Sequence, residues 1–408
     1  MKVLLVNKFI FPKGGAETYT FDVGKMLEEH DHEVQYFGLE NKKNIVGNRV
    51  ESYMTDMDFS KGIKANLNAP FRIIYSREAR KKIRAVLDDF QPDVVHLNNI
   101  QYHLTPSIIL EINKWRKQTK KQCRIIYTTH DYQLVCPSHG MFDVNMKPCE
   151  RCLDGHYIHC FQTKCLKNSR AKSLLGTLDG YMWKYSKAYS YVDAYICCSF
   201  FLKSKLDTQK RFRDKTIGLH NFKKEMPHLD NIQKKGYVLE FGHLSRDKGT
   251  DTLLEVAKKM PNTEFVFIGY GPSVDKMKDI PNVKYLGFKT GEELYRIIAE
   301  AAISVCPSEW YENCPYSVME SVLLGTPVVG SKMGGIPELI EPGKTGELFE
   351  AGNVEDLMKA IKKVLQTQDI LERYTKNCSQ VKYETTESYY IKLMKIYRGE
   401  KNVEKIAS

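Results

Sequence analysis

Residues 306–341, CPSEWYENCPYSVMESVLLGTPVVGSKMGGIPELIE, decide the fold because they join a predicted strand to a predicted helix through a short turn. The mainly apolar run 302–305 predicts a buried strand that ends at Pro307. Pro315 suits the first turn of the following helix, where its missing N–H removes no hydrogen bond. The free N–H groups and the positive dipole end of such a helix start bind anions. The stretch therefore predicts a diphosphate site.

Two glutamates, Glu312 and Glu320, lie on either side of this helix start. Glu320 could accept hydrogen bonds from two neighbouring ribose hydroxyls, and Glu312 would face whatever is attached beyond the phosphates. For an isolated pair of glutamates at this spacing, the better interpretation would be that both are solvated helix residues. Gly325 and the pair Gly334 and Gly335, in the same strand–helix–strand unit, change that balance. The layout is the one that a nucleotide-sugar site needs.

Taken whole, residues 306–341 resemble the E-x7-E region of retaining glycosyltransferases with the GT-B fold, family four. The match extends over more than thirty residues. It implies two Rossmann-like, doubly wound parallel-sheet α/β domains that face each other across a cleft, with the nucleotide bound by the second. It also implies that no metal or other cofactor is needed for catalysis. The donor-binding residues predicted within this stretch are Asn313, Cys314, Tyr316, Ser317 and Glu320.

A chain of 408 residues is long enough for two α/β domains. Apolar runs separated by helical segments predict the alternation of a doubly wound sheet in each half. We expect an N-terminal acceptor-side domain at 1–218 with a cysteine-rich insertion at about 136–170. A nucleotide-sugar-binding domain follows at 219–385. The resemblance implies that a last helix, within 386–408, crosses back to the first domain. In the first domain, strands are predicted at 32–37, 94–97, 124–129 and 192–199, and we expect the last of these to close the sheet.

Two features of the first half are candidate site residues. Gly14 and Gly15 follow the first apolar strand and would let a ligand come close to the backbone, although such turns also serve packing. His130 follows the strand 124–129, at the carboxyl end where ligands of parallel sheets bind. A histidine that only caps the sheet is an equal alternative from position alone. The resemblance favours hydrogen bonding between His130 and the transferred sugar.

The second half carries cations after its first strand. Lys248 occupies the lysine position of the family motif, but His243 stands where relatives have arginine. Either His243 acts as a weaker cation or Arg246 reaches in to neutralise the leaving diphosphate. With His130 and Glu312, these three are the predicted catalytic residues. Gly271 and Phe288 occupy the positions where relatives hold ribose and base.

The insertion contains two cysteine pairs with metal-ligand spacing. Cys149 and Cys152 form a C-x2-C pair, and Cys160 and Cys165 are separated by four residues. Four thiolates could close a tetrahedral structural zinc site and so hold together a segment too polar for its own core. Free cysteines in a mobile loop are the main alternative, and an iron–sulfur cluster is a smaller one.

The chain carries 61 Lys and Arg against 50 Asp and Glu, a net charge of +11. Basic clusters at 72–84, 114–124 and 203–215 predict attraction to an anionic membrane or a phosphate-bearing acceptor, although solvated helix faces explain each one equally well. Residues 164–191 predict a basic helix with an aromatic face, for which core packing is the commoner explanation. Neither a signal peptide nor a spanning helix is indicated, so we expect a cytoplasmic protein with peripheral contact at the inner face of the membrane.

These features together favour a retaining glycosyltransferase that moves a sugar from a nucleoside-diphosphate sugar to an acceptor hydroxyl. The resemblance implies a lipid-linked saccharide acceptor in polysaccharide biosynthesis. A nucleotide-sugar epimerase on the same fold is one alternative, since fold does not determine reaction. A non-enzymatic, metal-stapled basic protein that binds nucleic acid or anionic lipid is another. It ranks last because it leaves Glu312 and Glu320 without a purpose, and we expect no nucleic-acid partner.

Overall fold

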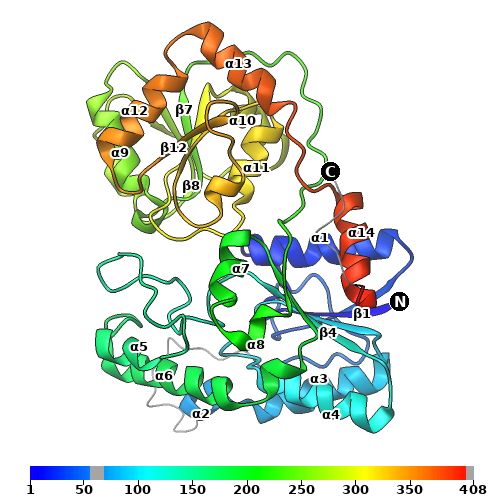
Figure 1. The fold of residues 1–408 in the computed structure, drawn as a ribbon. Coiled ribbons are helices and arrows are strands. Elements are labelled where there is room, and N and C mark those ends of the chain that lie inside the picture. The colour runs from blue at the N-terminus through cyan, green and yellow to red at the C-terminus, as the bar shows by residue number, and fades with distance from the viewer. Residues whose placement is uncertain (56–68, 401–408) are drawn as a thin grey trace. The chain divides into compact units, whose positions relative to one another are not determined.

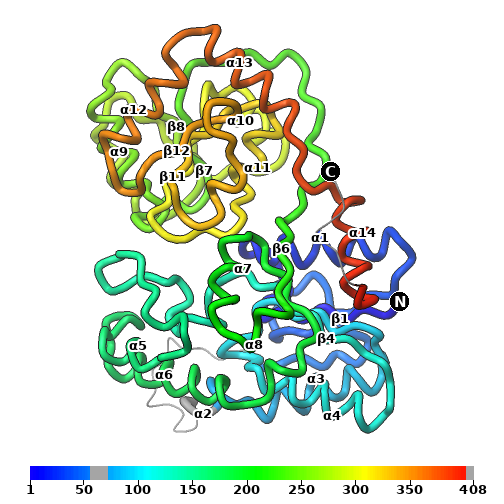
Figure 2. The backbone as a smooth tube through the Cα atoms, viewed as in Figure 1, coloured from blue at the N-terminus to red at the C-terminus, as the bar shows by residue number. Residues whose placement is uncertain are grey.

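The computed structural model describes residues 1–55 and 69–400, of which 69–71 are described by their backbone alone. The chain forms two units (Figure 1). Of the described residues, the first contains those of 1–144, 149–220 and 387–400, and the second contains 145–148 and 221–386. Figure 2 follows the backbone through both units. Residues 401–408, the end of the expected C-terminal segment, lie outside the described residues.

The first unit is built on a six-stranded sheet with the order β2-β1-β3-β4-β5-β6. Every neighbouring pair is parallel. Its first strand is fully buried from Val3 to Val6, as expected of a parallel strand covered on both faces. The strands are β1 (Lys2–Val6), β2 (Glu33–Phe37), β3 (Val94–Leu97), β4 (Arg124–Thr129), β5 (Ala194–Cys197) and β6 (Thr216–Gly218).

Helices connect the strands of this sheet. They are α1 (Gly15–Glu29), α2 (Ala69–Ile74), α3 (Arg77–Phe90), α4 (Ser107–Thr119), α5 (Ile158–Thr163), α6 (Arg170–Tyr185), α7 (Phe200–Leu206) and α8 (Lys210–Arg213). The expectation that residues 192–199 close the sheet is wrong, because β6 extends it and pairs Thr216 with Tyr195. Three residues are too few to show the alternation by which a strand is recognised in sequence.

The last helix, α14 (Thr386–Arg398), packs on the first unit through buried tyrosines. Tyr389 Oη lies 2.6 Å from Tyr19 Oη. Tyr397 Oη lies 2.7 Å from His96 Nδ1. All four side chains are buried. The hydroxyls therefore satisfy polar groups inside the unit, while the tyrosine rings supply apolar packing.

The second unit repeats the architecture, with the order β12-β11-β10-β7-β8-β9 and parallel pairing throughout. Its strands are β7 (Val238–His243), β8 (Phe265–Tyr270), β9 (Val283–Tyr285), β10 (Ile303–Cys306), β11 (Val328–Ser331) and β12 (Gly346–Phe349). Its helices are α9 (Thr250–Lys259), α10 (Gly291–Glu300), α11 (Tyr316–Leu323), α12 (Val354–Val364) and α13 (Gln368–Cys378). Two doubly wound parallel sheets confirm the predicted fold class.

One predicted element divides into several. The expected helix over 164–191 is wrong in its bounds, since α5 ends at Thr163, α6 covers the middle, and a 3₁₀ helix follows at Ala188–Tyr191. Lys167 and Asn168 adopt positive φ angles of 53° and 51°, which no α-helix tolerates. In the described parts of the chain, no helix is both long and apolar enough to cross a bilayer.

Candidate functional site

The strand order of the second unit changes direction between β7 and β10. The first strand of the unit, β7, lies between β8 and β10, so the chain winds outward from it on both sides. Ligands of such sheets bind at this switch point, outside the carboxyl ends of the strands. The turn after β7 carries Lys248, and the turn after β10 carries Glu312. The topology therefore brings together two side chains that are 64 residues apart in sequence.

Lys248 and Glu312 form an ion pair at this switch point. Lys248 Nζ lies 2.5 Å from Glu312 Oε1, to which Ser308 Oγ also donates a hydrogen bond at 2.7 Å. The ammonium lies 4.7 Å from the centre of the Trp310 ring. Burial disfavours the charge on Lys248, but the Glu312 carboxylate outweighs it, so the pKa of Lys248 is raised above its ordinary value. The lysine is therefore a fixed cation at neutral pH.

The second glutamate of the pair is held by a lysine that the sequence analysis did not identify. Lys223 Nζ lies 2.6 Å from Glu320 Oε1, and both side chains are largely buried, with exposed fractions of 13% and 14%. The same ammonium lies 5.4 Å from the ring centre of Tyr316, the first residue of α11. Two lysine–glutamate pairs thus flank one helix start.

The N-terminus of α11 lies between these two pairs. Its N-cap residue is Pro315, and within the described part of the chain no side chain caps this end of the helix. The positive end of the helix dipole therefore remains for an anionic ligand. The combination suits a ligand that carries phosphates in its middle and hydroxyl groups at its two ends.

The glycine pair after β11 determines where the Glu312 loop runs. Gly335 N donates to Glu312 O at 2.7 Å. Gly334 has φ 62°, and a Cβ at this position would lie 1.9 Å from Glu312 O. Only glycine permits this approach. The glycines therefore shape the loop that presents Glu312.

The other two candidate cations have surroundings of their own. His243 is exposed at the end of β7, and its ring packs edge-on against Tyr270 at 5.4 Å. Arg246 is also exposed and lines a different cavity, together with Asp251 and Lys276. Lys248 is the candidate that the structure brings to Glu312.

Phe288, which follows β9, and Tyr270, the last residue of β8, form an exposed aromatic pair, and Gly271 directly follows Tyr270. Phe288 is 64% exposed, and its ring centre lies 5.8 Å from that of Tyr270. A Cβ on Gly271 would lie 2.1 Å from Leu244 O, so this turn requires glycine. The result is an exposed aromatic surface next to close-packed backbone, which suits stacking with a planar ring.

The remaining candidates around α11 differ in what they present. Asn313 and Cys314 precede the helix, and Ser317 lies in its first turn. The Cys314 side chain points inward, since its Sγ contacts Met319 Sδ at 3.8 Å and burial raises its pKa to about 12. The Cys314 thiol is therefore turned away from the start of α11, and only the backbone of Cys314 remains for the predicted contact with a donor.

In the first unit, His130 follows β4 and is held by neighbouring side chains. Its Nε2 lies 2.9 Å from Asn98 Oδ1, and its ring centre lies 4.9 Å from that of Tyr19. Burial lowers the pKa of His130 to about 4, so the imidazole is neutral at pH 7. This neutral imidazole serves as a hydrogen-bonding group rather than as a cation.

Gly14 is the N-cap of α1, which begins at Gly15, and no side-chain hydrogen bond caps this helix start in the described structure.

Sequence reasoning missed Lys223, Asn98 and Tyr19. Lys223 lies just after the first unit gives way to the second at residue 221, where a lysine gives no motif signal, and it is 97 residues from Glu320 in sequence. Asn98 directly follows β3, and the rule that led to His130 at the end of β4 could have identified it.

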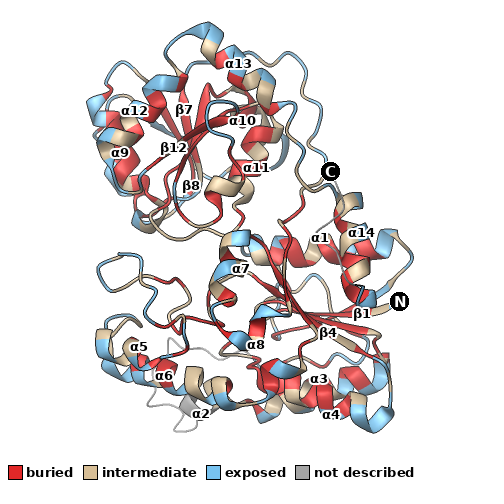
Figure 3. Ribbon diagram, in the orientation of Figure 1, coloured by how far each residue is buried: buried red, intermediate tan, exposed pale blue. Residues whose placement is uncertain are grey.

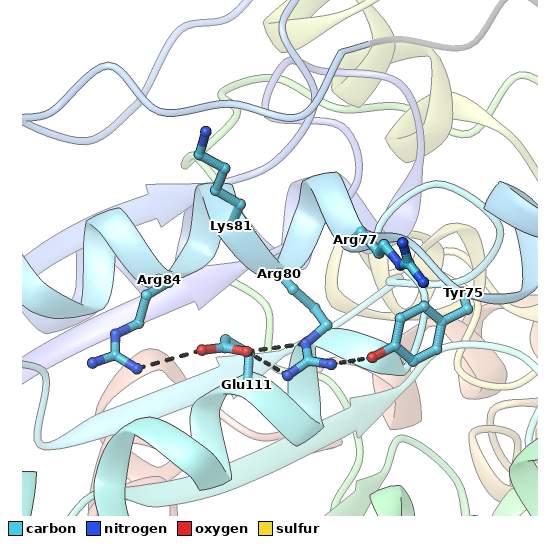
Figure 4. Close-up of a pocket in the computed structure, with 6 residues that line it drawn as sticks. All are labelled: Tyr75, Arg77, Arg80, Lys81, Arg84 and Glu111. Atoms are coloured by element: carbon cyan, nitrogen blue, oxygen red, sulfur yellow. Dashed lines mark hydrogen bonds and ion pairs between the residues drawn. The ribbon is translucent and has the colours of Figure 1, made fainter. Parts of the chain in front are cut away.

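Much of the basic cluster at 72–84 is neutralised within the first unit. Figure 4 shows Arg80 and Arg84 turned towards Glu111 in a cavity of about 370 Å³, whereas Lys81 points away from that carboxylate. Arg80 Nη2 lies 2.6 Å from Glu111 Oε2, and Arg72 Nη2 lies 2.6 Å from Glu78 Oε2. Most of these guanidinium groups therefore bind carboxylates of the protein itself, which weakens the case for this cluster as an anion-binding surface.

Three of the four predicted zinc ligands, Cys152, Cys160 and Cys165, pack together, but the sulfurs of the last two are not spaced as they would be around one metal ion. Cys160 Sγ and Cys165 Sγ are 2.9 Å apart, closer than the roughly 3.8 Å between two sulfurs on one tetrahedral zinc ion. Over the described residues, no three His, Cys, Asp or Glu side chains are grouped so that they could hold a metal. Cys152 packs with Cys160, and Cys149 is half-buried nearby in the chain. Zinc binding would require at least one thiol to rotate, and it stays a prediction.

Two family models match this chain. The model described as Glycosyltransferase Family 4 matches residues 13–221, and the model described as Glycosyl transferases group 1 matches residues 221–381.

Several proteins and solved structures are similar to this chain. A 42.6 kDa protein in the cps region of Klebsiella pneumoniae is 24% identical over 361 residues, which cover 83% of this chain and 87% of the relative. The amylovoran biosynthesis glycosyltransferase AmsK of Erwinia amylovora is 30% identical over 166 residues, which cover 37% of this chain and 41% of AmsK. The crystal structure of Anabaena Alr3699/HepE with UDP and glucose aligns with a TM-score of 0.65 at 15% identity, covering 98% of this chain and 99% of that one.

Proposed function

The chain belongs to glycosyltransferase family 4, and from this premise we propose that it transfers a sugar from a nucleoside-diphosphate sugar to an acceptor hydroxyl with retention of the anomeric configuration. The family membership confirms the resemblance in the sequence and makes the protein a glycosyltransferase of the hexosyl-transferring class. Donor, stereochemistry and acceptor are the parts that we propose.

One observation carries the donor assignment. The uncapped start of α11 lies between the pairs Lys248–Glu312 and Lys223–Glu320, at the topological switch point of the second unit. Backbone N–H groups and two ammonium groups favour a diphosphate. Carboxylates favour hydroxyl groups as hydrogen-bond donors. A nucleoside-diphosphate sugar has hydroxyls on the ribose and on the sugar, and phosphates between them.

The proposed chemistry relies on electrostatics and orientation. Lys248 and the dipole of α11 stabilise the charge that develops on the departing diphosphate. Glu312 hydrogen-bonds the transferred sugar, Glu320 hydrogen-bonds the ribose, and the exposed ring of Phe288 stacks with the base. His130, neutral at pH 7, donates or accepts a hydrogen bond at the sugar without changing charge. Orientation of the two reactants supplies much of the remaining rate.

Retention follows in this proposal from attack on the face that the diphosphate leaves. The carboxylate at the switch point, Glu312, is paired with Lys248 and hydrogen-bonded by Ser308, an arrangement that stabilises the carboxylate and lowers its nucleophilicity. We therefore assign Glu312 to substrate binding rather than to a covalent intermediate. Proton NMR of the first-formed product tests this step, because an inverted anomer would contradict it.

We propose a lipid-linked saccharide of surface-polysaccharide assembly as the acceptor. Support comes from similarity to a protein encoded in a Klebsiella cps region and to the amylovoran biosynthesis glycosyltransferase. The first unit, with His130 at the carboxyl end of its sheet, would provide the acceptor surface.

Incubation with radiolabelled nucleotide sugars, with and without membrane lipid extracts, tests the proposal. We expect slow donor hydrolysis alone and label transfer when the acceptor is present. Conversion of the donor sugar to its epimer without transfer would favour the epimerase. Failure to bind any donor would favour the binding protein.

Glu320→Gln tests the ribose assignment. We expect the donor KM to rise roughly tenfold with a smaller change in kcat, because a hydrogen bond to a charged group is lost. Glu341→Gln is the matched control, since this exposed glutamate of the same unit pairs with Lys344 at the surface. An unchanged donor KM in Glu320→Gln would remove Glu320 from the site.

His130→Ala tests the first unit. We expect kcat to fall by about tenfold or more with little change in donor affinity, because the lost hydrogen bond acts on the reacting sugar. Full activity would remove His130 from the site.

A further inference from the structure

The helix α6 presents large apolar side chains to solvent. Leu174 is 44% exposed, Leu178 51%, Met182 39% and Tyr185 77%. Their spacing of four, four and three residues places them on one face of the helix. In Figure 3, exposed residues recur along α6. Contiguous exposed apolar surface of this kind marks an interaction site more often than scattered single residues do.

The opposite face of α6 is small, polar and packed inward. Ser173 and Thr177 are buried, and Thr177 Oγ1 donates to Tyr157 O at 3.1 Å. Ser173 Oγ accepts a hydrogen bond from Leu166 N at 3.1 Å. A Cβ on Gly180 would lie 2.8 Å from the Tyr157 ring. These contacts hold the helix with its small residues inward, so the apolar face cannot turn into the core of the unit.

Positive charge lies at both ends of the exposed face. The basic residues of segment 164–187 are Lys164, Lys167, Arg170, Lys172, Lys184 and Lys187. The segment contains one acidic residue, Asp179, whose carboxylate accepts a hydrogen bond from Trp183 Nε1 at 3.0 Å. Four of these six, Lys167, Arg170, Lys172 and Lys187, are exposed and form a basic border at the two ends of the apolar strip, whereas Lys184 Nζ donates to Gly155 O at 2.9 Å.

We propose that this face of α6 docks on a membrane surface that contains anionic phospholipids. Leu174, Leu178 and Met182 enter the boundary between head groups and acyl chains, and Tyr185 lies at head-group level, where amphipathic rings are favoured. The lysines and arginine keep their charges in water and attract the anionic head groups. A second copy of this chain would place the same positive charges against each other, which disfavours self-association through this face.

Docking through α6 holds the first unit at the bilayer, where a lipid-linked acceptor would be found. The inference rests on the surface of α6 and not on the donor site. Membrane docking through α6 can therefore be confirmed or contradicted independently of the proposed reaction.

Vesicle co-sedimentation tests the proposal with the full-length protein. We expect binding to vesicles of phosphatidylcholine and phosphatidylglycerol, and weak binding to phosphatidylcholine alone. Leu174→Glu combined with Leu178→Glu should weaken partitioning by about tenfold or more, because two apolar side chains no longer enter the bilayer. The matched control is Ile391→Glu, which replaces a single apolar residue that is 45% exposed on another helix of the same unit.

The basic border has its own test. Arg170→Gln, Lys172→Gln and Lys187→Gln together should weaken binding to anionic vesicles by about tenfold or more, and added salt should weaken wild-type binding. Replacing three exposed lysines of the second unit, Lys359, Lys362 and Lys376, is the charge-matched control. Equal binding by the apolar variant and its control would overturn the proposal. The proposal would also be overturned if wild type did not bind vesicles and instead formed a dimer, seen by analytical ultracentrifugation, that the apolar variant disrupts.

Discussion

At the scale of single residues, the second unit contains a buried acid below its site. Glu240 on β7 is 4% exposed, and Thr250 Oγ1 donates to its Oε1 at 2.7 Å. Burial raises the pKa of Glu240 from 4.5 to about 8, so the carboxyl is largely protonated at neutral pH. This neutral acid lies on the strand that leads to Lys248.

Glu240 makes the stability of the protein depend on pH. Because its folded pKa is raised, the stability that it contributes is fully present below the unfolded pKa near 4.5 and is lost as pH rises towards 8. Between pH 6 and 8 we expect wild type to lose about 2 kcal/mol relative to Glu240→Gln, which cannot ionise. Urea unfolding at both pH values measures the difference. The same pH dependence in both proteins would mean that Glu240 is already ionised at pH 6.

At the scale of elements, the docking of α14 depends on a chain of buried hydrogen bonds. It runs from Tyr397 through His96 and Thr128 to Tyr19 and Tyr389, with contacts of 2.6 to 3.1 Å. Burial lowers the pKa of His96 to about 3, so this imidazole bonds in its neutral form. Tyr19 also contacts the ring of His130, which links the helix to the candidate site.

Removing one hydroxyl from this chain should destabilise the first unit. We expect Tyr397→Phe to lower the free energy of unfolding by about 1–3 kcal/mol, because His96 Nδ1 loses its partner inside the core. Tyr185→Phe is the control, since Tyr185 is 77% exposed. Equal melting temperatures for the two variants would show that water replaces the lost hydroxyl.

The cysteine segment is the second element whose behaviour can be measured. If zinc binds there, purified protein should retain about one zinc ion after dialysis, and Cys152→Ser should abolish retention. Cys123→Ser, at a buried cysteine outside the segment, is the control. Zinc-free protein with unchanged stability would leave Cys160 and Cys165 as packed free thiols.

At the scale of the whole molecule, the proposed donor site and the proposed acceptor and membrane surfaces belong to different units. The candidate donor residues near α11 belong to the second unit, whereas His130 and the exposed face of α6 belong to the first. Each unit has its own parallel sheet and buried core. A ligand of one unit should therefore leave a local signature.

Hydrogen exchange with and without nucleoside diphosphates should show that signature. We expect slower exchange in the turn 243–249 and at the start of α11, because bound phosphates engage these backbone groups and bind only the folded state. The strands of the first unit should change less. Protection confined to the first unit would place the nucleotide elsewhere and contradict the donor assignment.

Local sequence patterns sufficed to predict the repeating architecture and the residues of the candidate site around α11. Strands 94–97 and 124–129 were predicted with the bounds that the structure has, because buried parallel strands are short apolar runs. The helix start at Pro315 and the glutamates around it could be read from local spacing, since helix termini follow local rules.

Which side chains meet depended on the tertiary fold. It paired Lys223 with Glu320 and brought Lys248, rather than Arg246, to Glu312. It also turned the apolar face of α6 outward, where a periodic pattern alone favours burial. The physical reason is that periodicity reports which residues share a face, whereas the order of strands and the packing of small residues decide what that face meets.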